Sequence, residues 1–418
     1  MAGLGPFERL PRIAVAVSGG PDSLSLALLC HHWANTRGGE AIVLSVDHAL
    51  RAESASEIRQ VARWMKGRGI AHRALRWQRP AGRPTSALQA VARAARYGLM
   101  TEWCRRHGVL HLALAHHAGD QAETILMRLA RGGGPDGLAG MSAVASRDGV
   151  RLIRPLLLLA PARLRASLEV AGQDWIEDPS NRDPAFERVR WRRLIAPTLF
   201  ADLAGAAAEI GRERCLRERA VADLLALARI DPAGFLSMPL AGLQSAEAGV
   251  AERALGRCLV AIGGEPYGPS QEALARLRLG LVINGAARTL GGCRIVVGEE
   301  RLFVFREVAA AQQRAAAGMG VPIRWDGRFD LLPGRSGMIA RLGPVGWAKL
   351  SQARRPRSMP RDAALALPAL WRAGRPAVLA LSGAGAVPEG GIGSARFRPG
   401  QPLAPCGFTV AKLNVNII

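Results

Sequence analysis

The stretch AVAVSGGPDSLSLALL, from Ala14 to Leu29, joins two apolar runs through a pair of glycines and a proline. The first run, Ile13–Ser18, is rich in Val and Ile without polar alternation, which predicts a strand buried on both faces. The second run predicts a helix over Ser23–Asn35. The stretch is therefore typical of a strand, a glycine turn and a helix within a parallel sheet.

The same alternation continues over the first 130 or so residues. Two further buried strands are predicted over Ala41–Asp47 and Val109–Ala115. Three further helices are predicted: one beginning at a capping box of Ser54 and Glu57, one over Thr85–His107 and one over Asp120–Arg131. Strands that alternate with helices predict an α/β fold, with a doubly wound, Rossmann-like parallel sheet and right-handed crossovers.

Polar clusters follow the three predicted strands. They read SGGPDS (Ser18–Ser23), VDHALR (Val46–Arg51) and HHAGDQAET (His116–Thr124). Ligands of open parallel sheets bind beyond the carboxyl ends of the strands, so three clusters at corresponding ends predict one site.

The first cluster is a candidate phosphate cradle, made of Ser18, Gly19, Gly20, Pro21, Asp22 and Ser23. Its glycines let backbone N–H groups approach an anion, and the following helix points its positive dipole end at the same place. Asp22 is a poor direct contact for phosphate but a suitable Mg²⁺ ligand. No Gly-Lys-Ser/Thr follows, which excludes a Walker P-loop. A plain glycine–proline turn stays the alternative.

The other clusters supply the remaining candidates. Asp47 and His48 either line a nucleotide pocket or are a capping Asp and a surface His. His116 and His117 are adjacent, so their side chains point in opposite directions on an extended segment, and no cysteines accompany them. Zinc is therefore not favoured, and His117 is assigned to phosphate or ribose contact.

Asp120 and Glu123 lie within one turn of the predicted third-strand helix. An amphipathic surface helix with ion pairs would explain them, but its start at a strand's carboxyl end favours a role for Asp120. The candidate catalytic residues are Asp22, His117, Asp120 and Glu123, and the candidate Mg²⁺ ligands are Asp22 and Asp120.

The charge predicts a polyanionic partner. The chain has 56 Lys+Arg against 34 Asp+Glu, a net charge of +22, and only three of the basic residues are lysines. Arginine's planar fork suits phosphate, so nucleic acid is the expected partner. Arginines interleaved with aromatic residues favour RNA contact, although a solvated charged helix face is the alternative. The candidate RNA-binding residues are Arg128, Arg131, Trp175, Arg188, Arg190 and Arg193.

Three domains are expected. The first covers 1–197 and contains the candidate phosphate cradle, and the second covers 198–307 and is helical, with a hairpin over Thr289–Glu307 around Gly298. A low-complexity linker, Val308–Gly320, precedes a small α+β domain over 321–418. From Val308 onward there are 15 Lys+Arg against four Asp+Glu, which favours nucleic-acid binding with an affinity that falls as salt rises. No membrane partner is expected, since no apolar run reaches the length of a span. The six scattered cysteines, without a CxxC pair, favour reduced thiols in the cytoplasm.

These motifs resemble the PP-loop ATP pyrophosphatase superfamily, whose signature is SGGxDS. The blocks VDHALRAESASE (Val46–Glu57), HHAGDQAETILMRLARGGGPDGLAGM (His116–Met141), IRPLL (Ile153–Leu157) and WIEDPSNRDPAFERVRWR (Trp175–Arg192) resemble, in order, those of the tRNA(Ile)-lysidine synthetases. Two positions depart from that family's pattern. Gly119 stands where the family usually has a second Asp, and Val189 stands where it commonly has Asn.

The resemblance implies an ATP- and Mg²⁺-dependent ligase. It would join free L-lysine to C2 of the wobble cytidine, position 34, of the isoleucine tRNA with a CAU anticodon, through an adenylated base. It also implies that the glycine-rich segment Arg131–Met141 forms part of the active-site wall. By the same resemblance, the domain 1–197 would bind ATP, and the domains 198–307 and 321–418 would contact tRNA. Another PP-loop enzyme, such as a tRNA thiolation enzyme, is the alternative, but it would carry CxxC cysteines. A homodimer is left open.

Overall fold

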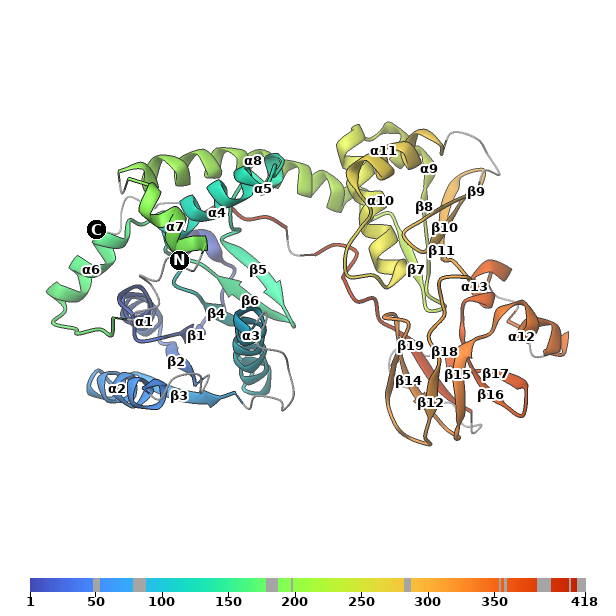
Figure 1. The fold of residues 1–418 in the computed structure, drawn as a ribbon, viewed down its shortest axis with the longest axis horizontal. Helices are drawn as coiled ribbons and strands as arrows, with labels where there is room; N and C mark the ends of the chain where they lie inside the picture. The colour runs from blue at the N-terminus through green and yellow to red at the C-terminus, as the bar shows by residue number, and fades with distance from the viewer. Residues whose placement is uncertain are drawn as a thin grey trace. The chain divides into compact units, whose positions relative to one another are not determined.

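The structure, a computed structural model, describes residues 1–47, 53–77, 88–177, 187–196, 198–281, 287–352, 355–356, 359–381, 392–405 and 407–411 (Figure 1). Two compact units emerge. One contains Met1–Leu216 with Cys406–Ile418, and the other contains Arg217–Pro405. The helix α8 (Leu199–Leu225) runs across this division, so the chain leaves the first unit within one helix and returns to it near its C-terminal end.

A six-stranded sheet in the order β3-β2-β1-β4-β6-β5 forms the centre of the first unit. All neighbouring strands pair in parallel except β5 and β6. The bounds are β1 Arg12–Ala16, β2 Glu40–Asp47, β3 Ala71–Arg76, β4 His111–Ala113, β5 Val144–Arg147 and β6 Val150–Ile153. The predicted parallel sheet is confirmed. Its order reverses between β1 and β4, which is where ligands of such sheets bind.

Helices lie against both faces of this sheet (Figure 1). On one face Ile13 and Val15 of β1 share a core with residues of α1 (Pro21–Asn35), α2 (Ser54–Gly67) and α6 (Pro161–Val170). On the other face Ala14 shares a core with residues of α3 (Leu88–Arg106). Each large apolar side chain buried in this way contributes about 1.5–3 kcal/mol. Alternating side chains of one strand therefore serve two cores, as the uniformly apolar run predicted.

Several local expectations differ from the structure. Ser54 and Glu57 form no capping box: α2 has Glu53 at its N-cap without a side-chain bond, and Ser54 Oγ donates instead to Asp47 Oδ1 at 2.8 Å. β3 was not predicted, because its sequence AHRALR is mostly exposed and lacks an apolar run. The β5–β6 hairpin was also missed.

Short helices complete the first unit. They are the 3₁₀ turn Ala2–Leu4, α4 (Ala118–Ala130), α5 (Pro135–Leu138) and α7 (Glu187–Leu194). No single helix among the described residues has the length and apolar character to cross a membrane; only the bent pair of α7 and α8 passes, on length and composition alone.

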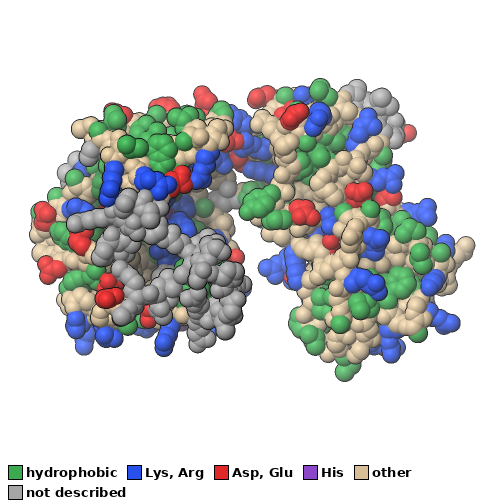
Figure 2. Space-filling view, in the orientation of Figure 1, with side chains coloured by type: hydrophobic (Ala, Val, Ile, Leu, Met, Phe, Trp, Pro, Cys, Tyr) green, Lys and Arg blue, Asp and Glu red, His purple; other side chains and the backbone are tan. Residues whose placement is uncertain are grey.

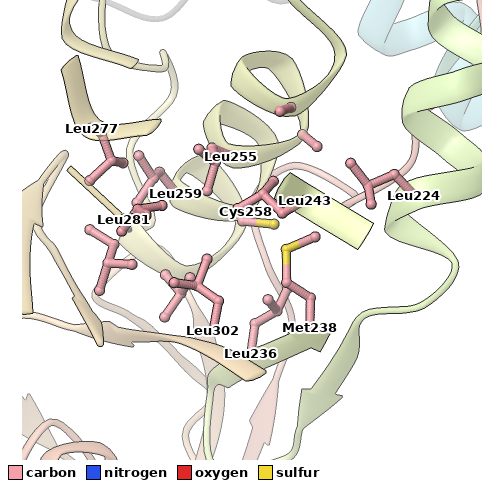
Figure 3. Close-up of a cluster of buried hydrophobic side chains, with 14 of the residues drawn as sticks. Leu224, Leu236, Met238, Leu243, Leu255, Cys258, Leu259, Leu277, Leu281 and Leu302 are labelled. Carbon is pink, nitrogen blue, oxygen red and sulfur yellow. The ribbon is translucent and has the colours of Figure 1, made fainter. Parts of the chain in front are cut away.

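The second unit begins with a five-stranded sheet in the order β7-β8-β11-β10-β9. Its strands are β7 Arg229–Asp231, β8 Phe235–Pro239, β9 Ala287–Leu290, β10 Cys293–Val297 and β11 Arg301–Arg306, and its helices are α9 Leu240–Ser245, α10 Ala248–Gly263 and α11 Gln271–Leu279. Figure 3 shows Leu255 and Leu259 of α10 directed toward Leu236 and Leu302 of the sheet. The predicted hairpin around Gly298 is confirmed by β10 and β11, but the other three strands of this mainly helical prediction were missed.

Two four-stranded sheets follow, in the orders β12-β15-β16-β17 and β13-β14-β19-β18. The elements are β12 Ala315–Ala317, β13 Ile323–Trp325, β14 Phe329–Pro333, β15 Gly337–Arg341, α12 Gly343–Lys349, α13 Arg361–Leu365, β16 Pro368–Arg372, β17 Arg375–Val378, β18 Ala380–Leu381 and β19 Gly393–Phe397. The predicted linker Val308–Gly320 contains β12, and its Ala311 is fully buried. This stretch is part of the folded unit, where Lys and Arg side chains are spread over the face drawn in Figure 2.

Candidate active site

The phosphate-loop candidate lies between β1 and α1, at the carboxyl edge of the sheet. Gly20 is the N-cap of α1, Pro21 is its first residue, and Asp22 lies in its first turn. Ser23 Oγ accepts the Ser18 N–H at 3.2 Å and donates to the Gly20 carbonyl at 2.9 Å. The loop therefore places a helix N-terminus, with its unpaired N–H groups, at the switch point of the sheet.

Gly19 and Gly20 differ in how strictly the fold requires glycine. Gly19 has φ +94°, and a Cβ there would lie 2.8 Å from Ile176 Cδ1 and 3.2 Å from Val61 Cγ2. The Gly19 carbonyl also accepts the Ile176 N–H at 2.9 Å. Gly20 has φ −74°, and its nearest neighbour would be 3.7 Å away. The fold therefore needs glycine at 19, whereas at 20 it has room for a side chain.

Gly19→Ala should lower the free energy of unfolding by about 1–3 kcal/mol, because the backbone there is unfavourable for any side chain. Gly20→Ala is the matched control and should change it by less than about 0.5 kcal/mol. Urea unfolding of both variants measures the difference. Equal stability of the two variants would contradict the assignment.

His117 caps α4. Its Nδ1 accepts the Gly119 N–H at 3.0 Å and the Asp120 N–H at 3.4 Å, and Asp120 Oδ2 in return accepts the His117 N–H at 3.0 Å. Because Nδ1 is an acceptor, the proton of the neutral ring lies on Nε2. Nε2 lies 3.5 Å from Asp22 Oδ2 and 3.6 Å from Asp120 Oδ2. The two candidate Mg²⁺ ligands of the sequence, Asp22 and Asp120, thus converge on one atom.

The charges around His117 shift two pKa values in opposite directions. Burial works against the charged form of His117, but the hydrogen bond with Asp22 and the charge of Asp120 outweigh it and raise the His117 pKa. Burial likewise disfavours the Asp120 carboxylate, yet His117, His116 and the backbone N–H bond hold its pKa below the ordinary value. Asp120 is therefore ionised at neutral pH and available as an oxygen ligand.

The absence of a side chain at Gly119 leaves room for the His117 imidazole ring. A Cβ at this position would lie 2.9 Å from His117 Cε1 and 3.1 Å from Nδ1. Any side chain would push the imidazole away from the two N–H groups that it accepts. The position where the resembled family usually has a second Asp is here occupied by backbone alone, packed against His117.

The residues fit Mg²⁺ better than zinc. Asp22 and Asp120 bring carboxylate oxygens to one point beside the phosphate loop. Mg²⁺ commonly binds through one or two carboxylates with phosphate and water oxygens completing its shell. Within the described part of the chain no three His, Cys, Asp or Glu side chains gather in a way that could hold a metal by themselves.

Glu123 is fully buried on α4 and paired with α7. Its Oε1 accepts from Arg192 Nε at 2.6 Å, whereas Oε2 lies 3.9 Å from Arg188 Nε and has no hydrogen-bond partner among the residues that the structure describes. Burial raises the pKa of Glu123, and the charge of Arg192 opposes that rise. A buried carboxylate oxygen without a donor is costly, so this atom is available to a cationic ligand.

The second strand contributes Asp47. Its Oδ1 accepts from Ser54 Oγ at 2.8 Å, and its carbonyl accepts the Trp77 N–H at 2.9 Å. Asp47 thus fixes the start of α2 at the same edge of the sheet. His48 lies outside the described residues.

The candidate RNA-binding residues lie in different settings. Arg188 approaches Glu123, with Nη2 3.4 Å from Thr124 Oγ1, while Arg190 and Arg193 are exposed on α7. Arg131 is exposed and paired with Glu187. Trp175 is half-buried, and its Nε1 donates to Glu177 Oε1 at 3.0 Å.

Arg128 is engaged elsewhere. Its Nη1 donates to the carbonyls of Gly137 and Gly140, both at 2.8 Å. This guanidinium therefore holds the glycine-rich segment Arg131–Met141 through two of its carbonyls. RNA contact by Arg128 stays a prediction.

Sequence reasoning missed two residues of the site. Arg192 binds Glu123 and lies 4.0 Å from Asp120 Oδ1. The 3.6-residue period of a helix could have predicted Arg192 as a site residue, because Arg192 follows Arg188 by one turn on the same face of α7. Arg154 Nε donates to His116 Nδ1 at 3.3 Å, and burial lowers the pKa of His116 to about 3. No sequence signal pairs Arg154 with His116, since the contact joins the segments that follow two separate strands, β6 and β4.

Comparison with known proteins shows the family of this chain. The PP-loop domain family matches residues 5–199. A tRNA(Ile)-lysidine synthase from Ruegeria pomeroyi is 38% identical over 368 residues, which cover 86% of this chain and 86% of that relative. This chain belongs to the tRNA(Ile)-lysidine synthase family. The family resemblance of the sequence motifs is thereby confirmed.

Other tRNA(Ile)-lysidine synthases match parts of the chain. The one from Novosphingobium aromaticivorans is 41% identical, covering 73% of this chain and 90% of the relative. The one from a Bradyrhizobium species is 46% identical, covering 47% of this chain and 55% of the relative. Among solved structures, a U34-tRNA thiolase from Methanococcus maripaludis has a TM-score of 0.43 at 17% identity, over 51% of this chain and 74% of that one. That likeness is distant and does not favour thiolation for this member of the lysidine synthase family.

Proposed function

We propose that this chain ligates lysine to C2 of the wobble cytidine of the CAU-anticodon isoleucine tRNA, consuming ATP. The observation that carries the proposal is the convergence of Asp22 and Asp120 on His117 beside a helix N-terminus, in a chain of the lysidine synthase family. The reaction belongs to the cytoplasm, where tRNA, ATP and lysine meet.

The first half-reaction is adenylation of the base. The C2 carbonyl oxygen of cytidine attacks the α-phosphate of ATP, and pyrophosphate leaves. The N–H groups at the start of α1 and the Ser18 hydroxyl bind the phosphates, while Ser23 holds the turn through its bonds to Ser18 and Gly20. Asp22 and Asp120 would hold Mg²⁺, which when bound neutralises charge on the phosphates. His117, with its proton on Nε2, orients both carboxylates.

The second half-reaction transfers lysine. The side-chain amine of lysine attacks C2, AMP leaves, and the nitrogen loses a proton. Lysine brings an ammonium and a carboxylate into the site, so it needs an acidic and a basic partner. We assign these roles to Glu123, whose Oε2 lacks a donor, and to Arg188 beside it.

The remaining arginines would hold the tRNA. Arg190 and Arg193 are exposed on α7, and Arg131 lies where the glycine-rich segment begins. The target base must leave its stack before its C2 atom can react, and Trp175 offers an aromatic surface on which the unstacked base can lie. The basic second unit would grip the tRNA away from the anticodon.

The adenylation half-reaction has a direct test. Pyrophosphate release from ATP is measured without RNA, with the CAU isoleucine tRNA transcript, and with the same transcript carrying uridine at position 34. Release should need the CAU transcript and no lysine. Equal release with the uridine transcript would sink the proposal, because adenylation would then not require the wobble cytidine.

The thiolation alternative has a test of its own. Burial raises the pKa of Cys30, Cys104, Cys258 and Cys293 to about 12, so these thiols are protonated and unreactive at neutral pH. Iodoacetamide at pH 8 should leave all four unmodified in the native protein and modify them after urea unfolding, as read by peptide mass spectrometry. Fast labelling of any of the four in the native state would revive a cysteine mechanism.

A further inference from the structure

A short segment near the end of the chain returns to the catalytic unit. Residues Gly407–Ala411, called here the C-terminal strap, follow the second unit in sequence but belong to the first. Thr409 N donates to Ser142 Oγ at 2.9 Å, and Thr409 O accepts the Ala143 N–H at 2.7 Å. Ala411 packs against the core that contains Ile13 and Val15. The strap is thus bound to the residues that directly follow the glycine-rich segment.

The strap also docks on α8, where the sequence leaves a notch for it. A Cβ at Gly211 would lie 2.9 Å from Phe408 Cε1 and 3.0 Å from Val410 Cγ2. Glycine within a helix costs about 1 kcal/mol relative to alanine, so its presence in the middle of α8 calls for a reason. Gly205 of the same helix has no neighbour within 4 Å of its would-be Cβ. Gly211, unlike Gly205, is needed for close approach of the strap.

Arg214 connects the docked strap to the glycine-rich segment. Its guanidinium lies over the Phe408 ring at 4.4 Å, and its Nη1 donates to the Asp136 carbonyl of α5 at 2.8 Å. Cys215 Sγ lies 2.7 Å from the Phe408 carbonyl. Phe408 therefore orients the same arginine that holds the middle of the glycine-rich segment.

Among the described residues, the strap adds to the contacts that α4 makes with that segment. From α4, Arg128 binds Gly137 and Gly140, and Gln121 exchanges two hydrogen bonds with Met141. The strap itself hydrogen-bonds to Ser142 and Ala143 directly, and it contacts α5 through Arg214. Ser142 O in turn accepts from Arg154 Nη1 at 2.7 Å, and Arg154 binds His116, the neighbour of the capping His117.

We propose that the C-terminal strap is a positioning element of the active site: Phe408, docked at Gly211, sets Arg214 and thereby holds the glycine-rich segment Arg131–Met141 against α4. The placement of that segment at the active site rests on the proposed function. The second unit, which is the candidate tRNA-binding unit, is linked to the first unit twice along the chain: through α8 and through the segment that leads into the strap. A strap that served only to fill space would need neither the notch nor the arginine bridge.

Phe408→Ala and Gly211→Ala test the proposal in the full-length chain. Hydrogen exchange of the 131–141 amides, read by peptide mass spectrometry, should accelerate about tenfold in both variants, because one support of the segment is lost. The kcat for lysine transfer should fall about tenfold while the KM for ATP stays within about twofold, since misplacement of a wall costs turnover more than nucleotide binding.

Two variants serve as controls. Gly205→Ala adds the same methyl group to α8 where nothing meets it and should behave as wild type in both readouts. Phe408→Tyr keeps an aromatic ring under Arg214 and should restore slow exchange and turnover. If Phe408→Ala does not fold, Gly211→Ala still tests the proposal, because it removes no contact within α8.

Wild-type exchange and wild-type kcat in Gly211→Ala and Phe408→Ala would overturn the proposal. The exchange result stands apart from the assigned reaction. If the wild-type chain made no lysidine but the variants still exchanged faster, the proposed function would fall and the support of the segment by the strap would remain. If lysidine formed normally in wild type and variants alike, with unchanged exchange, the strap alone would fall.

Discussion

Asp22→Ala should lower tRNA-dependent pyrophosphate release by about a thousandfold, the largest effect expected of any single substitution here. Asp22 lies in the first turn of α1 and meets Asp120 at His117 Nε2, so its removal takes away half of the carboxylate pair. Its side chain is about one-third exposed, and the fold should tolerate its loss. The measurement is the initial rate of pyrophosphate release at saturating ATP and CAU transcript.

Two companions make that result specific. Asp22→Asn keeps the shape and removes the charge, and it should lose nearly as much activity if the carboxylate binds Mg²⁺. Asp202→Ala removes an exposed carboxylate from the first turn of α8 and should keep the wild-type rate. Full activity of Asp22→Ala, with thermal unfolding like that of the wild type, would refute the role given to Asp22.

Glu123→Gln should separate the two half-reactions. Pyrophosphate release should stay within about threefold of wild type, while lysine transfer should fall by roughly 10- to 100-fold, which corresponds to the about 1.5–3 kcal/mol of a hydrogen bond to a charged group. The reason is that Oε2 of Glu123 accepts from no donor in the described part of the chain and lies 3.9 Å from Arg188 Nε. The KM for lysine should rise correspondingly.

The control for Glu123 is another glutamate of the same region. Glu187 pairs with Arg131 at an exposed position of α7, where ion pairs contribute little, so Glu187→Gln should leave both half-reactions unchanged. Glutamine at 123 keeps the volume of the buried side chain and can still accept from Arg192. An equal loss in both half-reactions would contradict the assignment, since Glu123 would then act before lysine enters.

The sequence predicts the catalytic fold because local and global signals agree there. Ile13, Ala14 and Val15 are all fully buried, so an uninterrupted apolar run was the correct mark of a strand between two helix layers. The same rule fails for β3, whose side chains are largely exposed at the sheet edge and carry no apolar pattern. It also fails for most of the five-stranded sheet of the second unit, where short strands give weak periodicity.

The site was predictable where strand order decides it. Parallel strands bring their carboxyl ends to one edge, which is why Asp22 and Asp120, 98 positions apart by number, meet at one imidazole. Side-chain partners across separate elements were not predictable. Nothing in the sequence joins Arg192 to Glu123, Arg154 to His116 or Phe408 to Arg214, because each pair depends on tertiary packing.

The proposed ligation of lysine to the isoleucine tRNA can be measured as transfer of labelled lysine to RNA. The wild-type chain is incubated with ATP, Mg²⁺ and labelled L-lysine, together with the CAU isoleucine tRNA transcript or the methionine tRNA transcript of the same anticodon. Label should enter the isoleucine transcript, at position 34, and should require ATP. No incorporation into that transcript, under conditions where the chain is folded and binds ATP, would contradict the account.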